Sequence, residues 1–190
     1  MRIIRRRDYS RMPWKNGQGL TEEVMAFPAG SSVESFDWRL SIAHVGTDGP
    51  FSVFPDIERT IALLDGEGLA LDLPEGRTVT LGPGSEPFSF PGDWVISSRN
   101  LRGATTDLNM MTRRGRYRHF MRRETVIGTL AVQAKHDALL VFNAMARVRS
   151  GVEQAELARW DTVRLEPGER LSVTSEGAVD LFLIDVRPEL

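Results

Sequence analysis

The chain has 190 residues, 41% hydrophobic and 26% charged, which is typical of a globular protein that buries a core without disulfides or structural metals. Its net charge of −2 lacks the basic excess of nucleic-acid-binding proteins, and the absence of cysteine excludes disulfides, thiolate metal ligands and cysteine nucleophiles. No apolar run is long enough for a membrane span, and the basic start lacks the apolar stretch of a secretory signal. We therefore expect a cytoplasmic protein whose partners include neither nucleic acid nor membrane.

Turns containing glycine and proline recur at short intervals, and the segments between them are apolar or alternate apolar with polar residues. This pattern is typical of an antiparallel all-β sandwich or barrel. A weak helical signal covers residues 154–158, which we expect to form a single turn. The predicted strands, in chain order, are residues 21–27, 38–42, 60–64, 69–73, 77–81, 88–90, 104–111, 138–142, 162–165, 170–174 and 179–186.

Two segments, residues 54–68 and 81–100, resemble the conserved blocks of cupins, which are double-stranded β-helices closed into jelly-roll barrels. The first ends a strand in a Gly-x-Gly turn, and the second contains Pro-Gly-Asp. Residues 165–171 also echo residues 71–77, which favours a bicupin-like arrangement of two related halves. We expect a single cupin-like unit over residues 1–190, in which residues 1–115 carry the specific motifs and residues 116–190 complete the β architecture.

Metal-binding cupins take a His-x-His pair and a glutamate from the first block and another histidine from the second. The three histidines here are His44, His119 and His136, and they are scattered without ligand spacing. The sequence therefore predicts neither a metal nor another cofactor, and it argues against an iron or manganese dioxygenase.

The most specific motif is PWKNGQGLTEE at residues 13–23, a glycine-rich loop that leads into a strand. It lacks the Gly-Lys-Ser/Thr of a P-loop. The motif resembles the N-terminal signature of the HutD/Ves family, with Thr21 and Glu23 at family positions and Gln18 replacing a glycine. The blocks WRLSIA at residues 38–43 and DLNMMTRR at residues 107–114 resemble family blocks in the same order. The resemblance implies a cupin-like barrel without the usual metal ligands, associated with histidine utilisation or stress, that senses or buffers an intermediate such as N-formylglutamate.

Alternation along strands groups several polar residues on shared faces. If those faces point into one barrel, they line a pocket for a small polar anion, in which Arg39 binds a carboxylate and the asparagines suit an amide or formamide. The competing interpretation is an internal salt-bridge network of Arg39 with Glu23 or Asp107 that holds no ligand. The candidate ligand-binding residues are Lys15, Asn16, Thr21, Glu23, Arg39, Ser41, Asp107 and Asn109.

Three functions remain open at this point. The first is a metal-independent protein that binds a small carboxylate or amino-acid derivative and has no catalytic residues. The alternative is a metal-independent isomerase or hydrolase, with Glu23 or Asp107 as base, Lys15 as acid or oxyanion stabiliser and His44 as proton shuttle. The third is a regulatory subunit that docks through the arginine cluster at residues 113–123, and edge strands also allow a homodimer.

Overall fold

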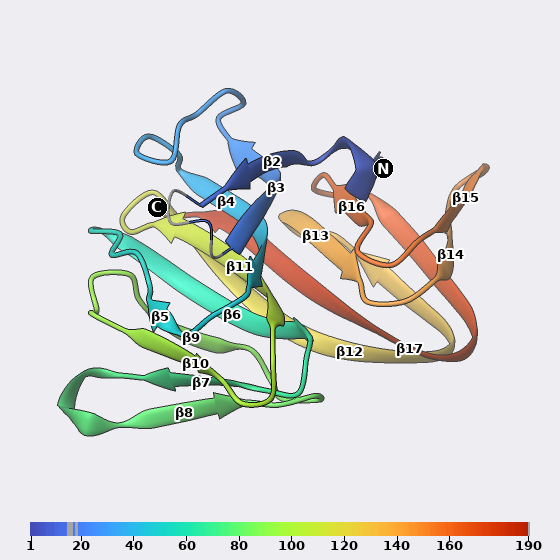
Figure 1. Ribbon diagram of the computed structural model, residues 1–190. Helices are drawn as coiled ribbons and strands as arrows, with labels where there is room; N and C mark the ends of the chain where they lie inside the picture. Colours follow the sequence, from blue (N-terminus) through green and yellow to red (C-terminus); the bar gives the residue numbers. More distant parts are fainter. Residues whose placement is uncertain (15–16, 18, 190) are drawn as a thin grey trace. The chain divides into compact units, whose positions relative to one another are not determined.

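The computed structural model describes residues 1–14, 17 and 19–189, and almost all regular structure in them is β-strand (Figure 1). Two short 3₁₀ helices, η1 (Arg6–Asp8) and η2 (Pro74–Gly76), are the other regular elements of these residues. No helix in the described ranges has the length and apolar character that crossing a membrane requires. The all-β prediction is confirmed.

The chain divides into two compact units. We call Ser10–Arg118 with Glu189 the motif unit, and Met1–Tyr9 with His119–Pro188 the C-terminal unit. The first residues of the chain thus belong with its second half, because Arg2–Ile4 pairs with Thr162–Leu165. A single cupin-like unit over residues 1–190 stays a prediction.

The motif unit contains two sheets, one of six strands in the order β2-β3-β4-β11-β6-β9 and one of four in the order β5-β10-β7-β8. Neighbouring strands in both of these sheets run antiparallel. The strands are β2 (Ser10–Pro13), β3 (Gly19–Phe27), β4 (Trp38–Val45), β5 (Gly49–Pro50), β6 (Ile57–Asp65), β7 (Leu69–Asp72), β8 (Thr78–Leu81), β9 (Phe88–Pro91), β10 (Ser97–Asn100) and β11 (Thr105–Arg113).

The C-terminal unit is built on one seven-stranded sheet in the order β1-β16-β13-β17-β14-β15, with β12 paired to β17 off this path. Figure 1 shows β12 and β17 as two long strands side by side. The strands are β1 (Arg2–Ile4), β12 (Tyr117–Gln133), β13 (Asp137–Phe142), β14 (Ala146–Ser150), β15 (Glu153–Leu157), β16 (Thr162–Leu165) and β17 (Arg170–Pro188).

The second half differs from the sequence prediction in four places, one of which is β14, a strand that was not predicted. Residues 154–158 do not form the expected helical turn, because this segment is strand β15, which pairs with β14 from Glu153 to Leu157. The strands predicted at residues 170–174 and 179–186 are one continuous strand, β17. Strand β12, which has 17 residues, was not predicted at all. Strand pairing outweighs the local sequence preference here, with the adjacent β14 for β15 and with strands more distant in the chain for β12 and β17.

A hydrophobic cluster packs the two sheets of the motif unit together. It shows which face of the six-stranded sheet points toward the four-stranded sheet. Ile61 and Leu63 of β6 pack with Leu69 and Leu71 of β7. Because side chains alternate along a strand, Arg59 projects from the same face of β6 as Ile61 and Leu63. This face of the six-stranded sheet is therefore directed at the four-stranded sheet.

Candidate functional site

Strand register brings six of the candidate residues onto one face of the six-stranded sheet. Asn109 of β11 lies opposite Ser41 of β4, which in turn lies opposite Glu23 of β3. Directly opposed residues on neighbouring strands project to the same side. Ala43 has Asp107 on one side and Thr21 on the other, which forms a second row. Arg39 shares the face because it is two residues from Ser41.

Arg39 forms an ion pair within this face. Its Nε donates to Glu23 Oε2 at 2.7 Å, and its Nη1 makes a long contact of 3.4 Å to Ser41 Oγ. The arginine is 5% exposed, whereas Glu23 is partly exposed. A buried guanidinium needs such a partner. The salt bridge anticipated between Arg39 and Glu23 is therefore present, and it occupies the group expected to bind a ligand.

Arg59 of β6 is a second buried arginine on the same face, 5% exposed, and sequence reasoning missed it. Its Nη2 donates to Asn109 Oδ1 at 2.8 Å, and its Nη1 donates to the Ser52 carbonyl at 3.1 Å. Burial, more than any other influence, lowers the pKa of Arg59 to about 10. Its Nε is also buried and has no hydrogen-bond partner among the described residues.

Aromatic rings surround the Arg59 guanidinium. Arg59 Cζ lies 5.2, 5.4 and 5.1 Å from the ring centroids of Phe51, Phe54 and Phe90, within range of cation–π attraction. These rings help to stabilise the charge without forming hydrogen bonds. They therefore leave Nε available as a donor for another group.

Asp107 is completely buried beside this arginine. Its Oδ1 accepts a hydrogen bond from Asn109 Nδ2, whereas its Oδ2 has no partner among the described residues. Burial raises the pKa of Asp107 to about 7, although the charge of Arg59 and the hydrogen bond from Asn109 act in the opposite direction. Burial therefore favours the protonated form of this carboxyl far more than in an exposed aspartate.

We call Arg59, Asn109 and Asp107 the Arg59 cluster, since Asn109 bridges the other two. A buried polar atom without a hydrogen bond costs about 1–3 kcal/mol, and such atoms are rare in native structures. The cluster has two, Arg59 Nε and Asp107 Oδ2. A small polar ligand or an ordered water that reached both atoms would remove this penalty.

Besides Glu23, the glycine-rich motif contacts this part of the sheet through Trp14. Trp14 Nε1 donates to Thr21 Oγ1 at 2.9 Å. Gly19 allows the indole to lie close to the strand, because a Cβ there would come within 2.6 Å of the Trp14 ring and 2.7 Å of the His44 carbonyl oxygen. The predicted ligand residues Lys15 and Asn16 lie outside the described residues, as does Gln18.

His44 lies on the opposite face of the sheet, so the structure does not bring it to Glu23 or Asp107 as the shuttle hypothesis requires. Its ring nitrogens contact Thr106 Oγ1 at 3.1 Å and Glu22 Oε2 at 3.2 Å. Glu22 is 1% exposed and also pairs with Arg11. His44 thus belongs to a separate polar group. Within the described chain, no three His, Cys, Asp or Glu side chains are placed to hold one metal ion.

The arginine cluster at residues 113–123 is largely compensated by carboxylates. The ion pairs join Arg114 to Asp93, Arg116 to Asp37, Arg118 to Glu189, Arg122 to Glu124 and Arg123 to Asp180. Arg113 instead donates to the carbonyl oxygens of Phe36 and Glu34. The docking hypothesis therefore gains no support from these side chains.

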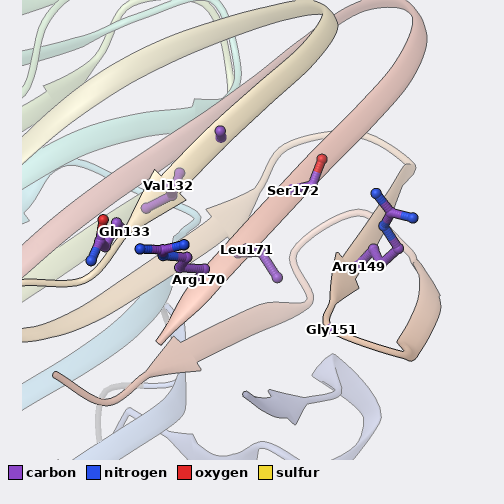
Figure 2. A pocket seen from close by; sticks show the side chains of 8 residues that line it. Val132, Gln133, Arg149, Gly151, Arg170, Leu171 and Ser172 are labelled. Carbon is purple, nitrogen blue, oxygen red and sulfur yellow. The ribbon is translucent and has the colours of Figure 1, made fainter. Parts of the chain in front are cut away.

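An open hollow in the C-terminal unit carries two exposed arginines, Arg149 and Arg170, at the ends of β14, β12 and β17. Figure 2 shows Arg170 beside Gln133, whereas Arg149 lies on the other side of Ser172. The two guanidinium groups do not converge on one point. The hollow is therefore a weaker candidate for an anion site than the Arg59 cluster.

Comparison with known proteins supplies the family context. The family model described as HutD matches residues 6–183. An uncharacterised 21.2 kDa protein in the hutC 3′ region of Pseudomonas putida is 35% identical over 174 residues, which cover 90% of each chain. Protein Ves of Citrobacter koseri is 42% identical over 113 residues, covering 57% of this chain and 58% of the relative. The predicted resemblance to HutD and Ves is confirmed.

Solved structures agree with this result. HutD from Pseudomonas fluorescens SBW25 has a TM-score of 0.79 at 33% identity, with 98% of both chains covered. A cupin 2 conserved barrel domain protein from Leptotrichia buccalis has a TM-score of 0.59 at 12% identity, covering 93% of this chain and 92% of the other. The latter likeness concerns the fold alone. It confirms the predicted cupin-like architecture.

Proposed function

Because the chain belongs to the HutD family, we propose that it is a cytoplasmic small-molecule-binding protein whose Arg59 cluster holds the carboxylate of a small metabolite. The proposal rests mainly on one observation, the buried Arg59 Nε that has no partner. A guanidinium N–H is a strong donor to a carboxylate, and the bond strengthens where water is excluded. In this proposal the ligand binds without a metal ion, since the sequence lacks cysteine and paired histidines.

The name of one relative supports a metabolic setting. The P. putida relative is named for its position beside hutC. We propose a carboxylate or amino-acid derivative of histidine utilisation, such as N-formylglutamate, as the ligand that this protein senses or buffers. Its formamide group matches the amide of Asn109, which both donates and accepts.

Calorimetric titration and thermal unfolding of the full chain would test this function. N-formyl-L-glutamate, formate, urocanate, L-glutamate and L-histidine are the probes. We expect at least one carboxylate to release or absorb heat and to raise the unfolding temperature, because a ligand that binds only the folded state stabilises it. Absence of both effects for every probe at millimolar concentration would contradict the proposal.

Two arginine variants show whether binding occurs at the Arg59 cluster. Arg59→Met removes the donor while keeping an apolar side chain of similar length, and we expect affinity to fall about a hundredfold or more. The matched control is Arg99→Met, on the four-stranded sheet, where the exposed Arg99 pairs with the half-buried Asp72. It should bind as the wild type does. Equal affinity of Arg59→Met and wild type would place the ligand elsewhere.

Asp107 also supports the enzymatic alternative. A carboxyl with a pKa of about 7 can take up and release a proton near neutral pH, as a general base must. If this alternative holds, N-formyl-L-glutamate or another bound probe should be converted over hours of incubation, and Asp107→Asn should abolish the conversion. An unchanged proton NMR spectrum of every bound probe would favour the binding function.

A further inference from the structure

The two unpartnered atoms of the Arg59 cluster differ in what they can bind. Arg59 Nε carries a hydrogen and can only donate. Asp107 Oδ2 accepts when the carboxyl is ionised, but it donates when the carboxyl is protonated. A ligand carboxylate has only acceptor oxygens. It can therefore satisfy both atoms only when Asp107 carries a proton.

Resting on the function proposed above, we propose that the Arg59 cluster binds the carboxylate of its ligand together with one proton, which resides on Asp107 Oδ2. In the complex, ligand oxygens accept from Arg59 Nε and from the protonated Asp107. Asn109 Nδ2 donates to Asp107 Oδ1 in either protonation state, so the amide need not change orientation. Binding is then coupled to pH, and affinity for the anion falls as the solution becomes alkaline.

The charges that face Asp107 fit this coupling. Arg59 on β6 contributes a positive charge, while Arg39 on β4 is already paired with Glu23 on β3. The four-stranded sheet contributes apolar side chains to this interior, among them Leu69 and Leu71, together with the uncharged Ser98, which lies opposite Leu71. With Asp107 ionised, the charges of the four ionisable side chains cancel. With Asp107 protonated, one positive charge remains for the anion.

The direction of the coupling follows from the same arrangement. Burial already raises the pKa of Asp107 to about 7, and a ligand anion beside it would raise that pKa further. Slightly above neutral pH, the free protein has mostly lost this proton and the complex regains it. Affinity should then fall about tenfold per pH unit above neutrality, until the pKa of the bound form is passed. A ligand that placed an N–H or ammonium group at Oδ2 would instead favour the ionised form and give the opposite slope.

Calorimetry of the full chain in buffers with different ionisation enthalpies measures the number of protons taken up. Formate and N-formyl-L-glutamate serve as probes at about pH 7.5 and 8.5, where both are ionised. We expect an uptake of between about half a proton and one proton per bound carboxylate. Zero uptake, or net release, with measurable binding overturns this inference but leaves the proposed binding function standing. Complete absence of binding overturns both.

Asp107→Asn tests whether this carboxyl is the group that takes up the proton. The asparagine amide donates at every pH, so the variant should bind formate without proton uptake and about tenfold more tightly than wild type near pH 8.5. The matched control is Asp72→Asn on the four-stranded sheet, which should keep the wild-type uptake. Retained uptake in Asp107→Asn would overturn the assignment.

Carbon NMR of aspartate side chains in the wild-type protein keeps the inference testable if Asp107→Asn does not fold. We expect one aspartate carboxyl to titrate near pH 7 in the free protein, and its midpoint to move upward by about two units or more with saturating formate. Titration of every aspartate below about pH 5, or a downward shift with formate, would overturn the inference.

Discussion

The interiors of the two units differ in chemistry. In the C-terminal unit, the buried side chains are apolar, including Leu140, Phe142 and Leu183, apart from Asp161 and Thr162, which are both hydrogen-bonded. In the motif unit, a similar apolar cluster adjoins the buried Arg39, Arg59, Asp107 and Asn109. Buried ionisable groups contribute little to stability even when paired. The first interior is therefore almost entirely apolar, whereas the second keeps ionisable groups at a cost in stability, which the proposed binding function would explain.

Shortening an apolar side chain in the C-terminal core should have the largest effect on stability. Leu140 is completely buried in that cluster, so Leu140→Ala should lower the free energy of unfolding by about 2–5 kcal/mol through lost contacts and a residual cavity. Urea denaturation followed by circular dichroism measures the change. A loss below about 1 kcal/mol would weaken the contrast between the two interiors.

Replacing the buried Asp107 of the motif unit should raise the free energy of unfolding at alkaline pH, rather than lower it. The folded-state pKa of Asp107, about 7, lies above its unfolded value, so wild-type stability should rise as pH falls from about 7 to 4. Asp107→Asn lacks this dependence and should be more stable than wild type at about pH 8, by on the order of 1–3 kcal/mol. Urea midpoints measured between pH 4 and 8 check this. A variant less stable than wild type at pH 8 would count against it.

Removing the buried arginine should cost less stability than shortening Leu140. Arg59→Met keeps the apolar volume but leaves Asn109 Oδ1 without its donor, so it should lower the free energy of unfolding by about 1–2 kcal/mol near pH 6. Thermal and urea unfolding give this value alongside the binding data. A loss as large as that of Leu140→Ala would show that Arg59 mainly supports the fold.

Breaking an exposed ion pair should have the smallest effect. Arg118 and Glu189 are paired at 2.6 Å, but the Arg118 side chain is 57% exposed. Arg118→Ala should cost less than about 0.5 kcal/mol and should leave ligand affinity unchanged. Urea midpoints and calorimetry compare it with wild type. A tenfold loss of affinity would indicate that the surface arginines take part in binding.

Much of the motif unit could be predicted from local sequence. Alternation of apolar and polar residues correctly separated Arg39 and Ser41 from Trp38 and Leu40, because one backbone rule determines which side chains share a strand face. The pairing of β4 with β3 and β11 depends on residues far apart in the chain. From the sequence alone, a pocket lined by these polar faces could therefore be predicted only on the condition that the three strands come together.

Arg59 could not be found in this way because both faces of β6 are buried. Its neighbours Thr60, Ile61 and Ala62 are all buried, so no alternation marks the arginine. The available signal was a charged residue directly before an apolar run. Strand β12 was missed for the opposite reason, since its arginine-rich first half has no apolar run, and its pairing with β17 is not a local property.

A crystal structure of the full chain saturated with N-formyl-L-glutamate would test the central claim most directly. We expect a ligand carboxylate oxygen within hydrogen-bond distance, about 2.7–3.2 Å, of Arg59 Nε. Ordered water alone on Arg59 Nε and Asp107 Oδ2, with the ligand bound at another place, would contradict it.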